Sequence, residues 1–418
     1  MTYNYHTLPN GIRIIHKQVP ATITHIGLIV NTGTRDENEN ESGIAHFIEH
    51  IIFKGTHKRN TYQVLSYLEN VGGDLNAYTT KEETFFYASL LNAYLPRAIE
   101  LLADIVFNST FQEKVIETEK EVVKEEIKLY KDTPSELIFD EFENLVFANH
   151  SLGTNILGTL QSVKNINRNK VLSFIHRTYN TNQMVLAVVG NIDFQHCIRE
   201  INKHFADKSP STRDFQRQPF TFNQTQHKSV KSYTNQAHAV VGCVLPNYDE
   251  RKNLIAVLLN NILGGQGLNS RLNMAIREKN GYVYNIESNY FALSDLGLFS
   301  IYIGSDFKNL DKCIELIYRE LKKLREQKLG RLQLHRAHLQ LIGQTCLFYE
   351  SNLNEMLSMG KNHLIFNEVE DISGMIQKIE TISSSELIAM ANEMLCEENM
   401  SSLFMVKSAQ KNSQSNFS

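Results

Sequence analysis

Residues 44–53 read IAHFIEHIIF, so two histidines and one glutamate stand within an otherwise apolar stretch. On a helix of about 100° per residue, His46, Glu49 and His50 fall in one sector, and isoleucines fill much of the opposite side. A helix that is apolar nearly all round is a buried helix. Because buried polar side chains are costly without partners, this polar sector requires an explanation.

Two explanations fit the polar sector. His46 and His50 can be a buried pair that backbone groups satisfy. Alternatively, histidines at positions i and i+4 project side by side and can share a metal ion. The order HxxEH is the inverse of the HExxH motif of zinc peptidases. Zinc would need a third protein ligand and would leave a fourth position for water.

The glutamate-rich segment 111–132, FQEKVIETEKEVVKEEIKLYKD, contains candidates for the third ligand, although it can also be a solvated charged helix. Helical spacing predicts one apolar stripe that includes two glutamates. The members of the stripe are Val115, Glu119, Val122, Glu126 and Leu129. The water-facing residues are Glu117, Glu121, Lys124, Glu125 and Lys128. One glutamate of the stripe is expected to bind the metal and the other to orient the site, but the stripe alone does not choose between them.

Composition limits the classes of function. The chain has 418 residues, of which 42% are hydrophobic, and this is enough for two buried domains. The net charge of −4 and the absence of a basic run argue against a nucleic-acid partner. No stretch approaches 18 apolar residues, so no membrane span is expected. The five scattered cysteines and the absence of a signal peptide at the N-terminus predict a cytoplasmic protein.

The two halves of the sequence resemble each other weakly. Residues 94–101 match 309–316, and residues 44–51 match 255–262, at offsets of 215 and 211. The second copy replaces His46, Glu49 and His50 by Val257, Asn260 and Asn261. A polar stretch at 205–236 separates the copies and is typical of a linker. We therefore predict a catalytic zinc-binding domain at 1–208, a linker at 209–226, a homologous domain without the metal motif at 227–408 and a flexible tail at 409–418.

Strand-like runs alternate with longer helical patterns in both halves, which indicates sheets covered by helices in α+β or α/β domains. The turn Pro9-Asn10-Gly11 predicts a hairpin near the N-terminus. The other predicted strands lie at 23–30, 84–90, 184–189, 239–245 and 298–303.

The spacing of these motifs resembles that of the pitrilysin/insulinase-type zinc peptidases. Within that family the chain is similar to the half-length bacterial members, which are themselves similar to mitochondrial processing peptidase. HxxEH at 46–50 is followed by EKEVVKEE, whose last residue, Glu126, stands 76 residues after His50. Further matches are LPNG at 8–11, GGDLNAYT at 72–79 and VVGN at 188–191. The resemblance implies an α+β fold of two tandem homologous domains, each a mostly antiparallel sheet covered by helices, that form half of a clamshell.

The resemblance also implies roles for individual residues. His46, His50 and Glu126 would bind Zn²⁺, Glu49 would be the general base, and Glu119 would support catalysis. The segment that contains Asn76 and Ala77 would form the strand that binds the substrate.

The second half carries another signature of this family. NSRL at 269–272 and IREKNGYVY at 276–284 are similar to its SRL…REKxGLxY run, although Tyr282 stands where leucine is usual. The resemblance implies that Arg277 and Tyr284 bind the substrate and stabilise the tetrahedral intermediate. Without the resemblance, the two would be surface or interface residues.

We therefore expect a zinc metalloendopeptidase (EC class 3.4.24) that cleaves small or unstructured peptides bound as an extended strand. In full-length relatives the arginine–tyrosine pair comes from the last of four domains. A two-domain chain then implies a dimeric chamber, either a homodimer or a heterodimer with a related subunit. The alternatives are a non-catalytic partner subunit of a heterodimeric peptidase and a module that binds metal or peptide without turnover.

Overall fold

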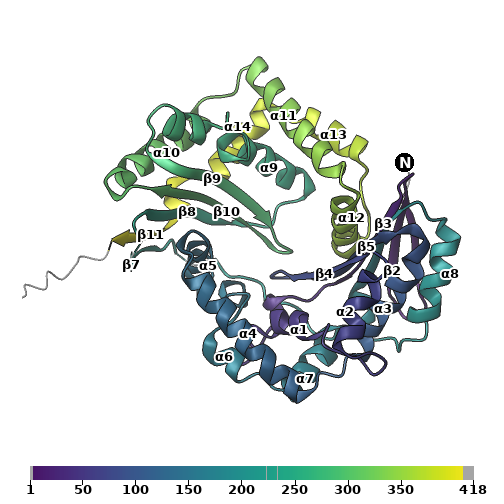
Figure 1. Cartoon of the computed structure of the whole chain (residues 1–418). Helices are drawn as coiled ribbons and strands as arrows, with labels where there is room; N and C mark the ends of the chain where they lie inside the picture. Colours follow the sequence, from purple (N-terminus) through teal and green to yellow (C-terminus); the bar gives the residue numbers. More distant parts are fainter. Residues whose placement is uncertain (1–2, 223, 233, 408–418) are drawn as a thin grey trace, which may run out of the picture. The chain divides into compact units, whose positions relative to one another are not determined.

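A computed structural model describes residues 3–222, 224–232 and 234–407 (Figure 1). The chain forms two compact units that are interleaved along the sequence. Unit 1 contains the described residues up to 129 together with 149–219 and 343–376. Unit 2 contains residues 130–148, 220–342 and the described residues from 377 onward. The predicted consecutive ranges differ from this arrangement at 130–148 and 343–376, and the predicted tail at 409–418 lies outside the described residues.

Unit 1 is built on a six-stranded, mostly antiparallel sheet, in which only β2 and β6 pair in parallel. From one edge to the other, its strands are β1 (Asn4–Thr7), β2 (Arg13–Gln18), β6 (Met184–Gly190), β3 (Ile23–Val30), β5 (Thr84–Leu91) and β4 (Asp74–Thr79). All seven residues of β6 are buried, as expected for a strand covered on both faces. Alternate residues of this strand contribute to two different hydrophobic clusters, one on each side of the sheet.

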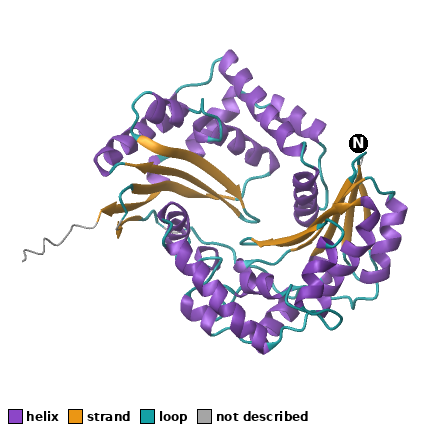
Figure 2. Cartoon of the chain, in the orientation of Figure 1, coloured by secondary structure: helices purple, strands orange, loops and turns teal. Residues whose placement is uncertain are grey.

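Helices cover both faces of this sheet (Figure 2). One face packs against helices that follow the early strands, and they share a large apolar cluster with it. These helices are α1 (Ile44–Ile51), α2 (Thr61–Glu69), α3 (Leu95–Asn108), α4 (Glu113–Lys131), α7 (Arg168–Thr178) and α8 (Phe194–Phe205), and the short helix α6 (Leu160–Lys164) also contributes. The other face packs against α12 (Asn352–Phe366), which comes from the second half of the sequence. Gly360 makes this packing close, because a Cβ atom there would lie 2.5 Å from Ile29 Cδ1.

Unit 2 repeats the strand order of unit 1 without the β1 edge. Its strands are β7 (His227–Ser232), β11 (Ser401–Lys407), β8 (Ala237–Pro246), β10 (Leu296–Ser305) and β9 (Val283–Ala292). The parallel pair β7–β11 corresponds to β2–β6, and the remaining pairs are antiparallel in both units. The predicted pair of homologous domains with mostly antiparallel sheets is therefore confirmed.

The helices of unit 2 follow the same plan. Those with most residues in this unit are α5 (Pro134–Val146), α9 (Glu250–Gly264), α10 (Leu310–Glu326), α11 (Arg331–Tyr349) and α14 (Ser384–Met394), and α13 (Ile372–Glu380) joins them at the unit boundary. Helix α5 comes from the first half of the sequence and packs on β8 and β11, where Phe139 lies 5.2 Å from the ring of Tyr302. Each sheet is thus covered on one face by a helix from the other half of the chain.

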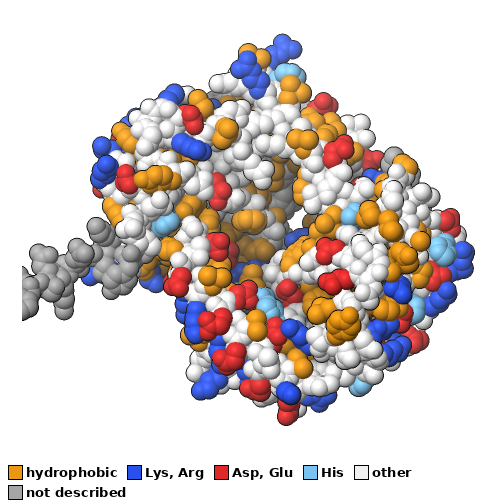
Figure 3. All heavy atoms as spheres, in the orientation of Figure 1, with side chains coloured by type: hydrophobic (Ala, Val, Ile, Leu, Met, Phe, Trp, Pro, Cys, Tyr) orange, Lys and Arg blue, Asp and Glu red, His pale blue; other side chains and the backbone are white. Residues whose placement is uncertain are grey.

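The surface of the helical layer in unit 1 carries charges of both signs. On α4, three glutamates each form an ion pair with the lysine three positions later, and all three glutamate side chains are exposed. Figure 3 shows basic and acidic side chains interspersed on this surface. Within the part of the chain that the structure describes, no helix combines the length and the apolar character that a membrane span requires.

Candidate active site

Helix α1 brings the HxxEH residues into the site and is held firmly at its N-terminus. It starts after Gly43, which has a φ of 85° and leaves no room for a Cβ atom, since one would lie 2.7 Å from the carbonyl oxygen of Leu157. The carboxylate of Glu37 accepts hydrogen bonds from the backbone N–H groups of Gly43 and Ala45, both at 2.9 Å. These donors would otherwise be unsatisfied at the start of the helix. Burial raises the pKa of Glu37 to about 8, although the two hydrogen bonds act in the opposite sense.

His46, His50 and Glu126 lie together. Each offers one potential ligand atom, and the three atoms are all within 4.8 Å of one another. The Nε2 atom of His46 lies 3.8 Å from Glu126 Oε1, and that of His50 lies 3.4 Å from Glu126 Oε2. Apart from this approach of His50, Glu126 Oε2 is buried without a hydrogen-bond partner among the described residues. Two imidazole nitrogens and a carboxylate oxygen are the donor set of many catalytic zinc sites, so these residues fit a divalent metal ion.

The charges around His50 favour a cation. Burial acts to lower the pKa of His50, but Glu119 and Glu126 outweigh this effect and raise it to about 9. His46 is more deeply buried, and this burial lowers its pKa. The proximity of His50 lowers the pKa of Glu126, which keeps that carboxylate ionised. Metals bind an ionised carboxylate and a neutral imidazole, so a metal ion at this site would displace the Nε2 proton of His50.

Glu119 contacts the Nδ1 side of the His50 ring, opposite the nitrogen that approaches Glu126. Its Oε1 atom lies 3.1 Å from His50 Nδ1, and its Oε2 atom lies 2.9 Å from Lys54 Nζ. Burial opposes ionisation of Glu119, yet its hydrogen bonds to His50 and Lys54 lower its pKa. Sequence reasoning missed Lys54, since a lysine just after a helix carries no signal by itself.

The predicted stripe on α4 was only partly right. The predicted water-facing glutamates are exposed, but so are Val122 (48%) and Leu129 (70%), which were expected to be buried. The buried residues of α4 are Ile116, Glu119, Lys120, Val123 and Ile127. The buried face of α4 is therefore rotated by roughly one residue, about 100° around the helix axis, from the predicted stripe. Glu119 and Glu126 stand at the border of the buried face, which is where a side chain can reach α1.

Glu49 stands beside the histidines on α1, and Thr79 is hydrogen-bonded to its carboxylate. The hydroxyl group of Thr79 donates to Glu49 Oε2 at 2.7 Å. Burial raises the pKa of Glu49, and the hydrogen bonds from Thr79 act to lower it. Thr79 belongs to the quoted segment 72–79 and shares a face of β4 with Ala77, because alternate residues of a strand point the same way. The alternation of residues along this strand was the sequence signal that could have identified Thr79.

Strand β4, which carries Asn76 and Ala77, is at an edge of the sheet. It pairs with β5 on one side, and no strand among the described residues pairs with its other side. The side chain of Ala77 packs against the core, whereas that of Asn76 is exposed and donates to Asp74. An exposed edge of this kind can accept an additional strand.

Arg277 and Tyr284 belong to unit 2. Arg277 lies in the π-helical turn η5 (Asn273–Glu278) and is exposed, and Tyr284 lies at the start of β9 with 58% of its surface exposed. The hydroxyl group of Tyr284 donates to Asp306 at 3.1 Å. Neither residue is buried in the fold of its own unit.

Both halves of the chain match models of one protein family. Residues 13–160 match the family described as insulinase (peptidase family M16), and residues 165–341 match the M16 inactive domain. An uncharacterized zinc protease of Bacillus subtilis, YmxG, is 30% identical over 94% of this chain and 96% of its own length. The chain belongs to peptidase family M16. A second relative, an uncharacterized zinc protease of Streptomyces coelicolor, is 32% identical over 93% of the chain and 86% of its own length.

Two solved structures share the M16 fold of this chain. A protease from Helicobacter pylori superposes with a TM-score of 0.89 over 97% of this chain and 99% of its own, at 20% identity. A protein from Pseudomonas fluorescens, described as a peptidase M16 inactive domain, gives a TM-score of 0.90 over 98% of each chain, at 16% identity. These similarities concern the fold alone.

Proposed function

We propose that this M16 protein is a zinc-dependent endopeptidase that hydrolyses small or unstructured peptides. The observation that carries the proposal is the grouping of potential ligand atoms of His46, His50 and Glu126 within 4.8 Å of one another. The carboxylate of Glu49 belongs to α1, the helix that carries both histidines. The names of the relatives as zinc proteases support the choice of metal.

Each residue of the site has a distinct part in the proposed reaction. His46, His50 and Glu126 hold Zn²⁺, and Glu119 keeps the Nδ1 proton of His50 so that Nε2 is free to bind. Zinc supplies Lewis acidity toward a peptide carbonyl and toward water. Glu49 takes a proton from the attacking water and returns it to the leaving amine. Burial raises the pKa of Glu49 toward neutral pH, and a general base is most efficient when its pKa lies near the pH of the reaction.

The free edge of β4 supports binding of an extended peptide. Strand addition uses the backbone groups of the peptide, so the backbone near Asn76 and Ala77 can pair with many sequences. A folded protein cannot present such a strand. This limits the proposed substrates to small or unstructured peptides.

We also propose that the protein acts as a dimer, most simply a homodimer. The support is the similarity of Arg277 and Tyr284 to the pair that full-length relatives supply from their last domain, together with the exposure of both residues on unit 2. In the dimer, unit 2 of the partner would supply this pair to the metal site of the first chain. A heterodimer with a related subunit would use the same geometry.

The test is the variant Glu49→Gln, with Glu121→Gln on the exposed face of α4 as its control. We expect about one zinc per chain in both, unchanged thermal unfolding, and a loss of peptide cleavage of about 10²-fold or more in Glu49→Gln alone. A protein without zinc would indicate a non-catalytic subunit. Zinc binding without cleavage that depends on Glu49 would indicate a binding module.

A further inference from the structure

Thr79 is the residue that contacts the proposed general base. Its hydroxyl group donates to one carboxylate oxygen of Glu49, Oε2, at 2.7 Å. A hydrogen bond of this length to a carboxylate is strong and directional. We propose that Thr79 is a positioning residue, which fixes the carboxylate of Glu49 by this hydrogen bond so that Oε1 faces the attacking water. The inference rests on the proposed function.

The chemistry requires such a constraint. A glutamate side chain has three rotatable bonds, and a general base must be held within hydrogen-bond reach of the proton that it takes. Glu49 is only half-buried, so packing alone does not fix the end of its side chain. The hydroxyl group donates to Oε2, and in this proposal Oε1 is the oxygen that takes the proton.

Thr79 is suited to this part because its own position is fixed. Threonine is branched at Cβ, which restricts its χ1 rotation. Thr79 is the last residue of β4, where it pairs with Thr84 of β5. The backbone N–H of Thr80 then donates to the carbonyl oxygen of Glu83 at 2.8 Å, which closes a tight turn directly after Thr79.

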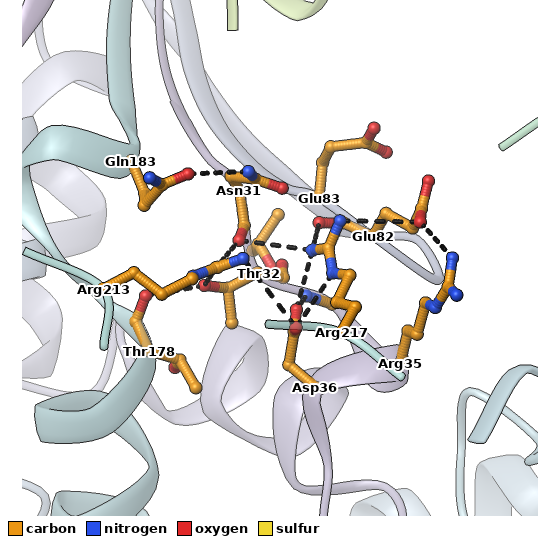
Figure 4. Close-up of polar contacts among 12 residues, drawn as sticks. Asn31, Thr32, Arg35, Asp36, Glu82, Glu83, Thr178, Gln183, Arg213 and Arg217 are labelled. Atoms are coloured by element: carbon orange, nitrogen blue, oxygen red, sulfur yellow. Dashed lines mark hydrogen bonds and ion pairs between the residues drawn. The ribbon is translucent and has the colours of Figure 1, made fainter. Parts of the chain in front are cut away.

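Ion pairs of Glu82 and Glu83, whose side chains are both buried, also hold this turn. Glu82 forms a 2.8 Å ion pair with Arg35, and Arg217 donates to the carbonyl oxygen of Glu82 at 2.7 Å (Figure 4). Glu83 forms a 3.1 Å ion pair with Lys361 of α12. Segments that are distant in sequence therefore converge on the turn at 80–83. These contacts restrict the backbone next to Thr79 and so fix the position of its hydroxyl group.

The experiment compares Thr79→Val, which keeps the shape and the β-branch but removes the hydroxyl group, with Thr79→Ser, which keeps the hydroxyl group. The control is Ser89→Ala on β5, which removes a hydroxyl hydrogen bond to His25 five residue pairs further along the ladder. We expect Thr79→Val to lower kcat by about tenfold, as for loss of a hydrogen bond to a charged group, with KM unchanged. Thr79→Ser and Ser89→Ala should stay within about twofold of wild type.

Readouts other than activity separate positioning from general damage. Zinc affinity, measured by chelator competition, and the unfolding temperature should be the same in all three variants and wild type. Crystal structures of the metal-free proteins should show the Glu49 carboxylate in one orientation in wild type and Thr79→Ser, and displaced in Thr79→Val. In a Glu49→Gln background, Thr79→Val should cause little further loss, because the two residues act through one contact.

The inference would be overturned if Thr79→Val had a kcat within twofold of wild type, or if Thr79→Ser lost as much kcat as Thr79→Val. It would also be overturned if Thr79→Val lowered kcat in the Glu49→Gln background by the same factor as in wild type. Failure of the proposed function is separately visible. If Glu49→Gln itself retains cleavage, the assignment of the general base is wrong, whatever Thr79 does.

Discussion

The Nδ1 atom of His50 lies 3.1 Å from Glu119 Oε1, and the opposite ring nitrogen, Nε2, lies 3.4 Å from Glu126 Oε2. One carboxylate therefore holds each side of the imidazole ring. The two glutamates are seven residues apart on α4, which is close to two turns of helix, so they project from nearly the same side. This relationship favours Glu119 as the residue that orients His50 and Glu126 as the proposed metal ligand, a choice that the helical stripe alone left open.

The first prediction concerns metal affinity. Glu126→Gln should weaken zinc binding most, because it removes a direct ligand. Glu119→Gln should weaken it by about 10- to 100-fold, as is typical for partners that orient a ligand. Glu125→Gln is the matched control, since its side chain is 71% exposed on the same helix. Competition with a chelator measures all three, and equal affinities for the 125 and 126 variants would show that the register of α4 against α1 is wrong.

The second prediction concerns the proposed dimer. Glu49→Gln and Tyr284→Phe should each be nearly inactive alone. When the two proteins exchange subunits, half of the dimers are mixed, and each mixed dimer has one of its two sites intact. Activity should recover to about a quarter of wild type. Exchange can be verified with differently tagged chains, and no recovery despite exchange would mean that Tyr284 does not act across the interface.

The third prediction concerns the ion pairs that attach the segment after α8 to unit 1. Arg217 forms two hydrogen bonds with the buried carboxylate of Asp36, at 2.9 and 2.8 Å (Figure 4). Arg217 also lies 3.5 Å from a carboxylate oxygen of Glu82, so Asp36→Asn removes one of two nearby negative charges. Removing one partner of a buried pair costs about 3 kcal/mol or more. The unfolding temperature of unit 1 should fall by about 6 to 12 °C, as measured by calorimetry. The control is Glu393→Gln, whose ion pair with Lys252 is 45% exposed on both sides and should contribute almost nothing.

The fourth prediction concerns stability at acidic pH. His16 is fully buried in β2, and burial lowers its pKa below the usual value of a histidine. The unfolded chain therefore binds a proton at a higher pH than the folded chain does. The stability that neutral His16 contributes is complete above the unfolded pKa of about 6.5 and is lost as the pH falls below it.

This loss should reach at most about 1.4 kcal/mol per pH unit for one proton. In His16→Phe, which can still pack against Phe194, the pH dependence of unfolding between pH 7 and 5 should be shallower than in wild type. Urea unfolding at several pH values measures both slopes. Parallel curves for the two proteins would show that the pKa of His16 is the same in the folded and the unfolded chain.

Structural elements that depend on residues close together in the sequence could be predicted well. The strand predicted at 23–30 is β3 over the same residues, and those at 84–90 and 184–189 differ from β5 and β6 by one residue each. The helix that carries His46, Glu49 and His50 is also where the pattern placed it. Hydrophobic periodicity reports such elements because it depends only on neighbours along the chain.

Contacts between distant segments needed the tertiary structure. The polar segment predicted as a linker contributes Arg213 and Arg217 to unit 1, where both approach Asp36. Composition gave no hint of this, because arginines in a polar stretch are usually solvated. Likewise, α12 carries no mark in its sequence that it packs on the sheet of unit 1.

The sequence by itself predicted the candidate metal-binding residues, since two histidines one helical turn apart and a glutamate at a set distance are local or family-specific signals. The tertiary structure decided how these residues are held: Lys54 against Glu119, Thr79 against Glu49, and the side of α4 that is buried. The physical reason is that helix and strand periodicity are set within a few residues, whereas a hydrogen bond between side chains 30 or 69 positions apart depends on how the elements pack. Val122 and Leu129 illustrate this, because their apolar side chains fit the helical pattern and yet are largely exposed.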